Sequence, residues 1–453
     1  NMCGCKKPYF RLWISSMEES AIREGFNNLK DGREYDNLYN SALCRAKADW
    51  IIGINATRLF TSLYRKHLNI GRVQTPTLAM IAERDSKISM FRKEKYYTVE
   101  IDGGNIKAVS DKISDKDEAQ NLQAACHERQ AVCISAVKEK KKTGAPKLFD
   151  LTTLQREANR IFGYTAKQTL DYAQSLYEKK LITYPRTDSR YLTDDMHNTV
   201  IKIVHIASKF APFSNCTDFK PDTFCLFNNE KVSDHHAIIP TAEIENISLA
   251  EIPNGESNIL HLIMCKLLCA VNSPYEYETI TAVLECGGVQ FTAKGKIILF
   301  EGWKNIEQLF KRYIHSDTDR AEDVFCITKG ETVTVSSEVK EGYTSPPKAF
   351  TEDTLLSSME TAGAAETTDE AERKGLGTPA TRAAIIEKLV QTGFAERKGK
   401  SIVATHNGIS LVSVLPEKLT SPILTSDWEN NLAEIAKGNY CLLYTSDAAD
   451  EAR

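Results

Sequence analysis

The sequence places a tyrosine directly before Pro-Arg in the stretch "LITYPRTDSRYL", residues 181–192. A phenol has a pKa of about 10, so it becomes a nucleophile only beside a cation or a base. Pro185 favours an extended backbone at Tyr184, and residues two apart share a face of a strand, so Arg186 could reach the same phosphate. The pattern predicts attack of Tyr184 on a phosphodiester, but it also fits a tyrosine packed at a sheet edge.

A second candidate for chemistry is the histidine pair His235-His236 in "SDHHAIIPT". A histidine can donate a hydrogen bond to a phosphate or act as a general acid. Adjacent side chains of an extended chain point to opposite faces, so at most one of the two should reach a given site. A histidine that only anchors a loop is the alternative.

The stretch "NIGRVQTPTLAMIAERD" offers Arg72 and Gln74 beside Gly71, just ahead of a predicted helix. This arrangement suits a DNA phosphate near a helix start, although an ordinary loop-to-helix junction has the same composition. Arg45 and Asp49 in "CRAKADW" have the i, i+4 spacing that is typical of an ion pair on a helix surface.

Nucleotide and metal sites are not supported by the sequence. "RKGKS" contains Gly-Lys-Ser, but a phosphate-binding P-loop needs a glycine five residues before Gly399, where Phe394 stands. The 12 cysteines are scattered without the spacing of a zinc ribbon, as in proteins of a reducing cytosol. We therefore predict no ATP site, no metal-ligating residue and a cytoplasmic location.

A helix–turn–helix pattern precedes the tyrosine. In "LFDLTTLQREANRIFGYTAKQTLDYAQSLYEKKLITYPR", Gly163 separates two amphipathic helices, and Thr165 with Gln168 forms a capping box for the second. "LITYP" is predicted as a short strand that Pro185 must end. Two helices and a strand are the layout of a winged helix, a common nucleic-acid scaffold.

A similar pattern lies near the C-terminus, in "LGTPATRAAIIEKLVQTGFAERKGKSIVAT". Thr378 is the predicted N-cap of a helix with Pro379 in its first turn, and Gly393 ends that helix. "FAERKGKSIVAT" predicts a hairpin with a basic tip at Lys398–Lys400, which is again wing-like.

The 453 residues are too many for one core, so two to four domains are expected. Alternating strand patterns occur on both sides of the helical middle, which indicates one β-rich domain interrupted by another. The predicted division is a helical segment at 1–93, a β-rich part at 94–140, a winged-helix-like tyrosine domain at 141–275, a second β-rich part at 276–340, a helical and winged-helix segment at 341–440, and a non-native or disordered tail at 441–453.

The charge and hydropathy of the chain limit its partners. No apolar run approaches the roughly 18 to 20 residues of a membrane span, so no membrane association is expected. The net charge of −4 does not indicate a nucleic-acid binder, but binding depends on local basic surface. The run "KEKKKTGAPK", residues 138–147, is either such a surface or a solvated linker.

Taken together and in order, nine stretches resemble a bacterial type IA DNA topoisomerase, most like topoisomerase III. The resemblance covers roughly residues 10 to 438. The stretches read "RLWISSMEESAI", "RAKADWIIGINATRLF", "GRVQTPTL", "FDLTTLQREANRIFGYTAKQTLDYAQSLYE", "LITYPRTDSRYL", "HHAIIPT", "PPKAFTEDTLLSSME", "GLGTPATRAAIIEKL" and "LTSDWENNLAEI". The resemblance implies a mixed α+β multidomain toroid with winged-helix-like (CAP-like) domains and a split β-rich arch.

The resemblance also implies roles for individual residues. Tyr184 would attack one DNA strand and keep a 5′-phosphotyrosyl link, Arg186 would stabilise the developing charge, and His235 would contact the scissile phosphate. The polar segment 187–190 would form the rim of this site. The residues that match the DNA-contacting segment of the family are Asn69, Ile70, Gly71, Arg72, Val73 and Gln74. Arg45 and Asp49 are also expected to bind DNA.

One departure from the family concerns the metal. The family's N-terminal Toprim domain carries an acidic Mg²⁺ site and should precede "RLWISS", but only a few residues do so here. We expect Mg²⁺ for the complete enzyme, no use of ATP, and an inactive chain without that domain. The expected partners are single-stranded and negatively supercoiled DNA, and the expected state is a monomer.

Two other functions stay open. A tyrosine recombinase also forms a tyrosyl–DNA link, but its tyrosine would lie near the C-terminus, and Tyr184 does not. A non-catalytic single-stranded-DNA-binding protein with two winged helices would need no nucleophile. Covalent trapping of DNA on Tyr184 separates the enzyme from the binding protein.

Overall fold

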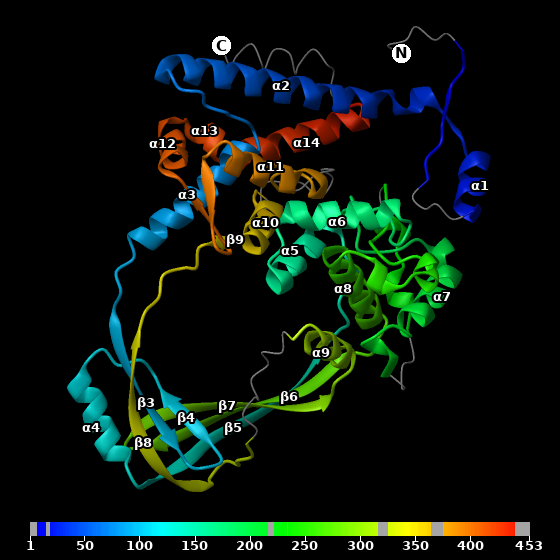
Figure 1. The fold of residues 1–453 in the computed structure, drawn as a ribbon. Helices are drawn as coiled ribbons and strands as arrows, with labels where there is room; N and C mark the ends of the chain where they lie inside the picture. The colour runs from blue at the N-terminus through cyan, green and yellow to red at the C-terminus, as the bar shows by residue number, and fades with distance from the viewer. Residues whose placement is uncertain are drawn as a thin grey trace.

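The computed structural model describes residues 7–14, 19–215, 222–232, 234–315, 325–363 and 375–439. Figure 1 shows its helices and strands arranged in a ring, with a β-barrel across from the long helix α2 (Asp36–Tyr64). The mixed α+β architecture predicted from the sequence is confirmed. None of the helices in these ranges is long and apolar enough to cross a membrane. The predicted tail at 441–453 falls outside them.

The barrel is closed, with antiparallel strands in the order β3-β4-β7-β6-β5-β8. Two distant parts of the chain supply its strands, because a helical unit is inserted between β5 and β6. Alternate residues of β3 are buried, as expected for a strand with one face on a core. The barrel elements are β3 (Lys95–Asp102), β4 (Lys107–Ser110), α4 (Lys116–Cys126), β5 (Arg129–Thr143), β6 (Tyr275–Cys286), β7 (Val289–Phe300) and β8 (Thr332–Tyr343).

The basic run is not a linker over most of its length. Lys138–Lys142 lie in β5, where they pair with β6, and residues 138–143 are exposed on both faces of the strand. Lys142 makes an exposed ion pair with Glu276 of β6. These lysines therefore form a basic surface on a regular strand.

The tyrosine unit, defined here as residues 148–271 with α9, has its own hydrophobic core. Gly163 ends α5 with φ +72°, and Thr165 and Gln168 form the capping box of α6, both as predicted. Ile306 and Phe310 of α9 belong to this core, so the range 276–340 is not purely barrel. The helices are α5 (Leu151–Phe162), α6 (Ala166–Glu178), α7 (His197–Ala207), α8 (Asn254–Ala270) and α9 (Trp303–Tyr313).

The base unit, defined as residues 32–90 and 350–439, packs early and late parts of the chain together. Thr378 caps α11 with Pro379 in its first turn, and β10 and β11 form the predicted hairpin. Besides α2, its elements are α3 (Gln74–Ser89), β9 (Phe350–Thr351), α10 (Glu352–Thr361), α11 (Pro379–Gln391), β10 (Ala395–Lys398), β11 (Ser401–Ala404), α12 (His406–Val414), α13 (Glu417–Thr420) and α14 (Ile423–Lys437). Outside the three units lie β1 (Phe10–Arg11), α1 (Glu19–Asn27) and β2 (Lys30–Asp31).

The tyrosine unit meets the base through polar contacts between α5–α6 and α10–α11. The Arg156 guanidinium lies 2.8 Å from an Asp353 carboxylate oxygen. The Ala166 amide at the start of α6 donates to the buried Glu352 carboxylate, which is also paired with Arg397. This interface joins two units with separate cores.

Candidate active site

Tyr184 lies in a loop and not in a strand, so the strand predicted at "LITYP" is wrong. Ile182 forms only an isolated antiparallel bridge with Pro240, and residues 184–191 have no regular secondary structure. Pro185 and Pro240 both lack the N–H that a ladder would need, which explains why the pairing stops after one bridge. The argument that Tyr184 and Arg186 share a strand face therefore does not apply.

The Tyr184 ring contacts two other rings. Its centroid lies 5.4 Å from that of Tyr177 on α6, in an edge-on arrangement, and 4.4 Å from the imidazole of His235. Tyr184 is half-buried, whereas Arg186 is exposed. The phenol thus has a fixed ring with an imidazole beside it and a cation two residues away.

The two adjacent histidines have different environments. His235 is exposed and contacts the Tyr184 ring. His236 is buried, and its Nδ1 lies 2.9 Å from the Ala237 carbonyl oxygen. The structure therefore brings His235 to Tyr184 while His236 packs inside, as the alternation of an extended chain predicts.

The polar residues after Arg186 hold the loop in place. Thr187 donates its hydroxyl to the His235 carbonyl at 2.7 Å, and Ser189 donates to the Lys231 carbonyl at 2.8 Å. The sequence led us to expect these residues at the rim of an open phosphate site. Both side chains are buried, so Thr187 and Ser189 do not form such a rim. Instead they fix the loop that carries Tyr184 against the loop that carries His235.

Residues 148–152, at the start of α5, contact both of these loops. The Leu151 amide donates to the Thr187 carbonyl at 3.0 Å, and Arg190 Nε donates to the Leu148 carbonyl at 3.0 Å. Phe149 pairs with Ile238 in an isolated bridge. The segment is therefore the support on which the loops around Tyr184 and His235 rest.

Two charge effects stand out near this support. Burial raises the pKa of Asp150, the N-cap of α5, to about 6, against hydrogen bonds from Thr153 that lower it. Lys147 and Lys231 each place an ammonium nitrogen 5.1 Å from the Tyr191 ring centroid. A hydrogen bond from Lys147 is the main cause of the lowered pKa of the Tyr191 phenol. Two lysine ammonium groups thus lie beside the loop at Tyr191.

The predicted DNA-contacting arginine, Arg72, points into the base. Its Nε donates to Asp49 at 2.8 Å, its Nη1 donates to Glu429 at 3.0 Å, and the guanidinium lies over the Trp428 ring at 5.2 Å. Burial lowers its pKa, but the hydrogen bonds and charges of Asp49 and Glu429 outweigh burial and raise it overall. Arg45 Nη2 lies 2.8 Å from Glu429, so Arg45 and Asp49 belong to one network with Arg72, in which Arg72 and Glu429 are buried and Asp49 is exposed.

The other residues of this segment also make internal contacts. The Ile70 N–H donates to the hydroxyl of Thr57 on α2 at 3.1 Å, and the Gly71 N–H donates to the Thr75 hydroxyl at 3.1 Å. Asn69, Val73 and Gln74 are half-buried. The Gln74 amide nitrogen, at the first residue of α3, is buried without a hydrogen-bond partner in the described structure.

Sequence reasoning missed Tyr177 and Glu429 as site residues. Tyr177 lies four residues before the stretch at 181–192, and Glu429 lies in "LTSDWENNLAEI". Both residues are in stretches that the sequence analysis considered, but no local signal marks their roles. Only the fold shows that Tyr177 contacts Tyr184 and that Glu429 pairs with Arg72.

Residues 33–442 match the protein-family model described as "DNA topoisomerase". The chain belongs to the bacterial type IA DNA topoisomerase family. It is 41% identical over 454 residues to DNA topoisomerase 3 of Bacillus subtilis, which covers 96% of this chain and 62% of the relative. It is also 41% identical to DNA topoisomerase 3 of Bacillus licheniformis, over 95% of this chain and 62% of the relative. The chain thus spans about 62% of the length of these relatives.

The topoisomerase fold is also found in a solved structure. Full-length topoisomerase I from Thermotoga maritima superposes with a TM-score of 0.76 and 23% sequence identity. The match covers 97% of this chain and 72% of that chain. The toroid expected from the resemblance is confirmed as the fold.

The part of this topoisomerase chain that the structure describes does not form a metal site. Within it, no group of three or more His, Cys, Asp or Glu side chains is placed to hold an ion. The described residues therefore do not supply a site for the Mg²⁺ expected of the complete enzyme.

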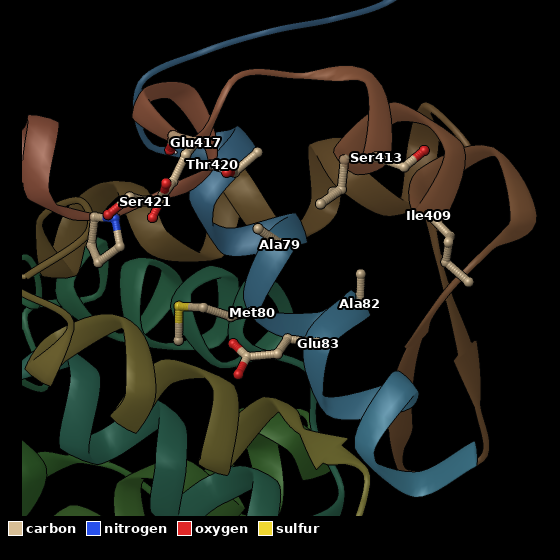
Figure 2. A pocket seen from close by; sticks show the side chains of 11 residues that line it. Ala79, Met80, Ala82, Glu83, Ile409, Ser413, Glu417, Thr420 and Ser421 are labelled. Atoms are coloured by element: carbon tan, nitrogen blue, oxygen red, sulfur yellow. Dashed lines mark hydrogen bonds between the residues drawn. The ribbon is translucent and has the colours of Figure 1, made fainter. Parts of the chain in front are cut away.

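A pocket of about 490 Å³ lies in the base, away from the tyrosine unit. Figure 2 shows it between α3, α12 and the α13 region. Its walls are mostly small or apolar and include Ala79, Met80, Glu83, Ile409, Val412 and Thr420. None of the predicted site residues lines it, so we do not assign it to the topoisomerase chemistry.

Proposed function

We propose that this chain carries the strand-cleaving half of an ATP-independent type IA topoisomerase. Tyr184 Oη attacks a phosphorus atom of one DNA strand, the bond from phosphorus to the 3′ oxygen breaks, and a 5′-phosphotyrosyl link forms. Another DNA strand passes, and the released 3′ hydroxyl then attacks the link and restores both groups. This cycle of cleavage, strand passage and resealing relaxes negative supercoils or unlinks catenated DNA. The observation that carries this proposal is the Tyr184 ring beside His235, with exposed Arg186 two residues on.

The side chains around Tyr184 supply complementary roles. Arg186 presents a planar set of N–H donors that can contact two phosphate oxygens and stabilise charge that develops in the transition state. His235 can donate a hydrogen bond to the scissile phosphate from beside the phenol. A tyrosyl phosphodiester has a leaving group at least as good as a sugar hydroxyl, so resealing needs no ATP.

The binding partners follow from the same chemistry. Single-stranded DNA is the proposed substrate, as the resemblance to type IA topoisomerases implies, and negatively supercoiled DNA supplies such strands. The exposed lysines of β5 support binding through phosphate contacts that are independent of sequence. A monomer acting in the cytoplasm, with Mg²⁺ held by a Toprim domain, completes the proposal.

The test is a gel relaxation assay combined with single-strand binding. The 453-residue chain should bind a single-stranded oligonucleotide, with affinity that falls steeply as salt rises, and should not relax plasmid even with Mg²⁺. The full-length protein encoded by the gene should relax negatively supercoiled plasmid with Mg²⁺ and without ATP.

Each outcome has a clear meaning. Relaxation by the 453-residue chain alone would disprove the need for a separate metal-binding domain. Failure of the full-length protein, with single-strand binding intact, would favour the non-catalytic binding protein.

A further inference from the structure

An arginine of the base contacts the support under the active-site loops. Arg382 on α11 donates from Nη1 to the Thr152 hydroxyl at 2.9 Å and from Nε to the Leu376 carbonyl at 3.3 Å. Its side chain belongs to the base, whereas Thr152 is the second residue of α5 in the tyrosine unit. The two residues are 230 positions apart in the chain.

Arg382 is deeply buried, with 2% of its surface exposed. Burial is the main cause of its lowered pKa, and the charges of Glu360, Asp150 and Asp188 act in the opposite direction. These three acids come from α10, from the N-cap of α5 and from the loop after Tyr184. Removing a guanidinium from water costs free energy, which filling space in the core would not require. Arg382 is therefore better explained by its specific contacts than by packing alone.

The hydrogen bonds beyond Thr152 lead to the loops that carry Tyr184 and His235. Leu151, next to Thr152, donates to the Thr187 carbonyl, and Thr187 donates its hydroxyl to the carbonyl of His235. Thr187 is three residues after Tyr184. The Thr152 residue that Arg382 contacts is therefore one peptide away from the hydrogen bond to the Tyr184 loop. The Thr187 hydroxyl then connects that loop to the His235 loop.

We propose that Arg382 is a positioning residue for DNA cleavage, which holds the loops of Tyr184 and His235 in their productive arrangement by docking the start of α5 onto α11. It acts through Thr152 and does not contact the reacting atoms. This inference rests on the proposed function for its catalytic consequence, but the docking itself is a property of the fold.

The catalytic test uses the full-length protein and measures covalent complex formation on a single-stranded oligonucleotide. Arg382→Met should lower the rate at saturating DNA about 10- to 100-fold, because small displacements of a nucleophile have effects of this size. The Kd for the oligonucleotide should change by less than about twofold, since Arg382 is buried. Arg382→Lys should keep part of the rate, and Thr152→Val should show a smaller loss in the same direction.

The matched control is Arg160→Met on α5, the helix that Arg382 contacts through Thr152. The Arg160 side chain is 63% exposed and pairs with Glu157 three residues earlier. The substitution therefore removes one arginine charge, as Arg382→Met does, without changing the interface. Its rate and Kd should equal those of the unaltered protein.

A second measurement tests the docking without any catalysis. In the 453-residue chain, Arg382→Met and Thr152→Val should speed hydrogen exchange of the Leu151 amide, while amides of the β6–β7 pairing in the barrel stay protected. If the Met variant does not fold, the Lys and Val variants decide both measurements.

The outcomes separate this inference from the proposed function. Unchanged cleavage and unchanged Leu151 exchange in folded variants would overturn the role of Arg382. Equal losses in rate and DNA affinity would show that Arg382 serves binding and not positioning. If the unaltered full-length protein forms no covalent complex, the proposed function fails, and the exchange measurement still decides whether Arg382 docks α5.

Discussion

The two stretches that the sequence predicted to contact phosphate have opposite environments in the structure. Around Tyr184, Arg186 and His235 are exposed to solvent. Around Arg72, the guanidinium is enclosed and already bonded to Asp49 and Glu429. Both stretches contain an arginine beside residues suited to a phosphate, so residue type alone does not separate them.

The difference shows which arginine can act on a substrate. An exposed guanidinium keeps its donors for a ligand, whereas a buried guanidinium with two carboxylates has used them within the protein. We infer that Arg186 acts on rate, while Arg72 holds α2, the start of α3 and α14 together. Substitutions in the two regions should therefore change different quantities.

The largest effect is expected at the nucleophile. Tyr184→Phe in the full-length protein should abolish cleavage, because it removes only the attacking oxygen, and should leave the Kd for single-stranded DNA within about twofold. Tyr177→Phe is the matched control, since it keeps the ring that packs on Tyr184 and should cleave normally. Cleavage by the Tyr184 variant would remove the central claim.

The next largest effect is expected on the stability of the base, at Arg72. Arg72→Met should lower the free energy of unfolding by about 3 to 5 kcal/mol, because it removes the charge-assisted hydrogen bonds to Asp49 and Glu429 and leaves the buried Glu429 carboxylate with Arg45. Lys87→Met, which breaks an exposed pair with Glu83, should cost less than about 1 kcal/mol. Chemical denaturation of the 453-residue chain gives both values.

The same Arg72 variant also tests the DNA-contact prediction. A large loss of single-strand affinity with unchanged stability would mean that Arg72 leaves its network to bind DNA. That result would reverse the contrast between the two arginines.

A somewhat smaller effect is expected at Arg186. Arg186→Lys keeps the charge but loses the planar donor set, so cleavage should slow by roughly 100-fold, equivalent to about 3 kcal/mol of transition-state stabilisation. Its unfolding midpoint should not move, because the side chain is exposed. A loss below about threefold, or an equal loss of stability, would make Arg186 a structural residue like Arg72.

The smallest effect concerns Asp150 under the active-site loops. Its pKa is raised from 3.8 to about 6, so the folded chain favours the protonated carboxyl more than the unfolded chain does. The protonated carboxyl therefore contributes to the free energy of unfolding at low pH, and this contribution is lost as the pH rises through about 6. Asp150→Asn stays neutral, so its stability relative to the unaltered chain should rise between pH 4 and 7, by up to about 2 to 3 kcal/mol. Urea denaturation across that range measures the difference, and a difference independent of pH would contradict the raised pKa.

Local features of the fold were predictable because their signals lie within a few residues. The capping box of Thr165 and Gln168 and the helix start at Thr378 appear where the sequence placed them. The strand at "LITYP" failed because it depends on its partner, and that partner is Pro240.

The site was predictable only in part for the same physical reason. Tyr184 was found from its own neighbours, but the burial of Arg72 depends on Glu429, 357 residues away in the chain. The support at 148–152 and its contact with Arg382 depend on how two units pack. Spacing within one stretch carries no information about such contacts.

The most direct measurement of the central claim is to map the covalent adduct. The full-length protein is incubated with Mg²⁺ and a single-stranded oligonucleotide labelled at either end, denatured, digested with protease and analysed by mass spectrometry. We predict protein-linked label only from the 3′-labelled strand, because the 5′-phosphotyrosyl link retains the downstream fragment, and a nucleotide adduct on Tyr184. An adduct on another residue, transfer of the 5′ label, or DNA binding without any adduct would contradict the account.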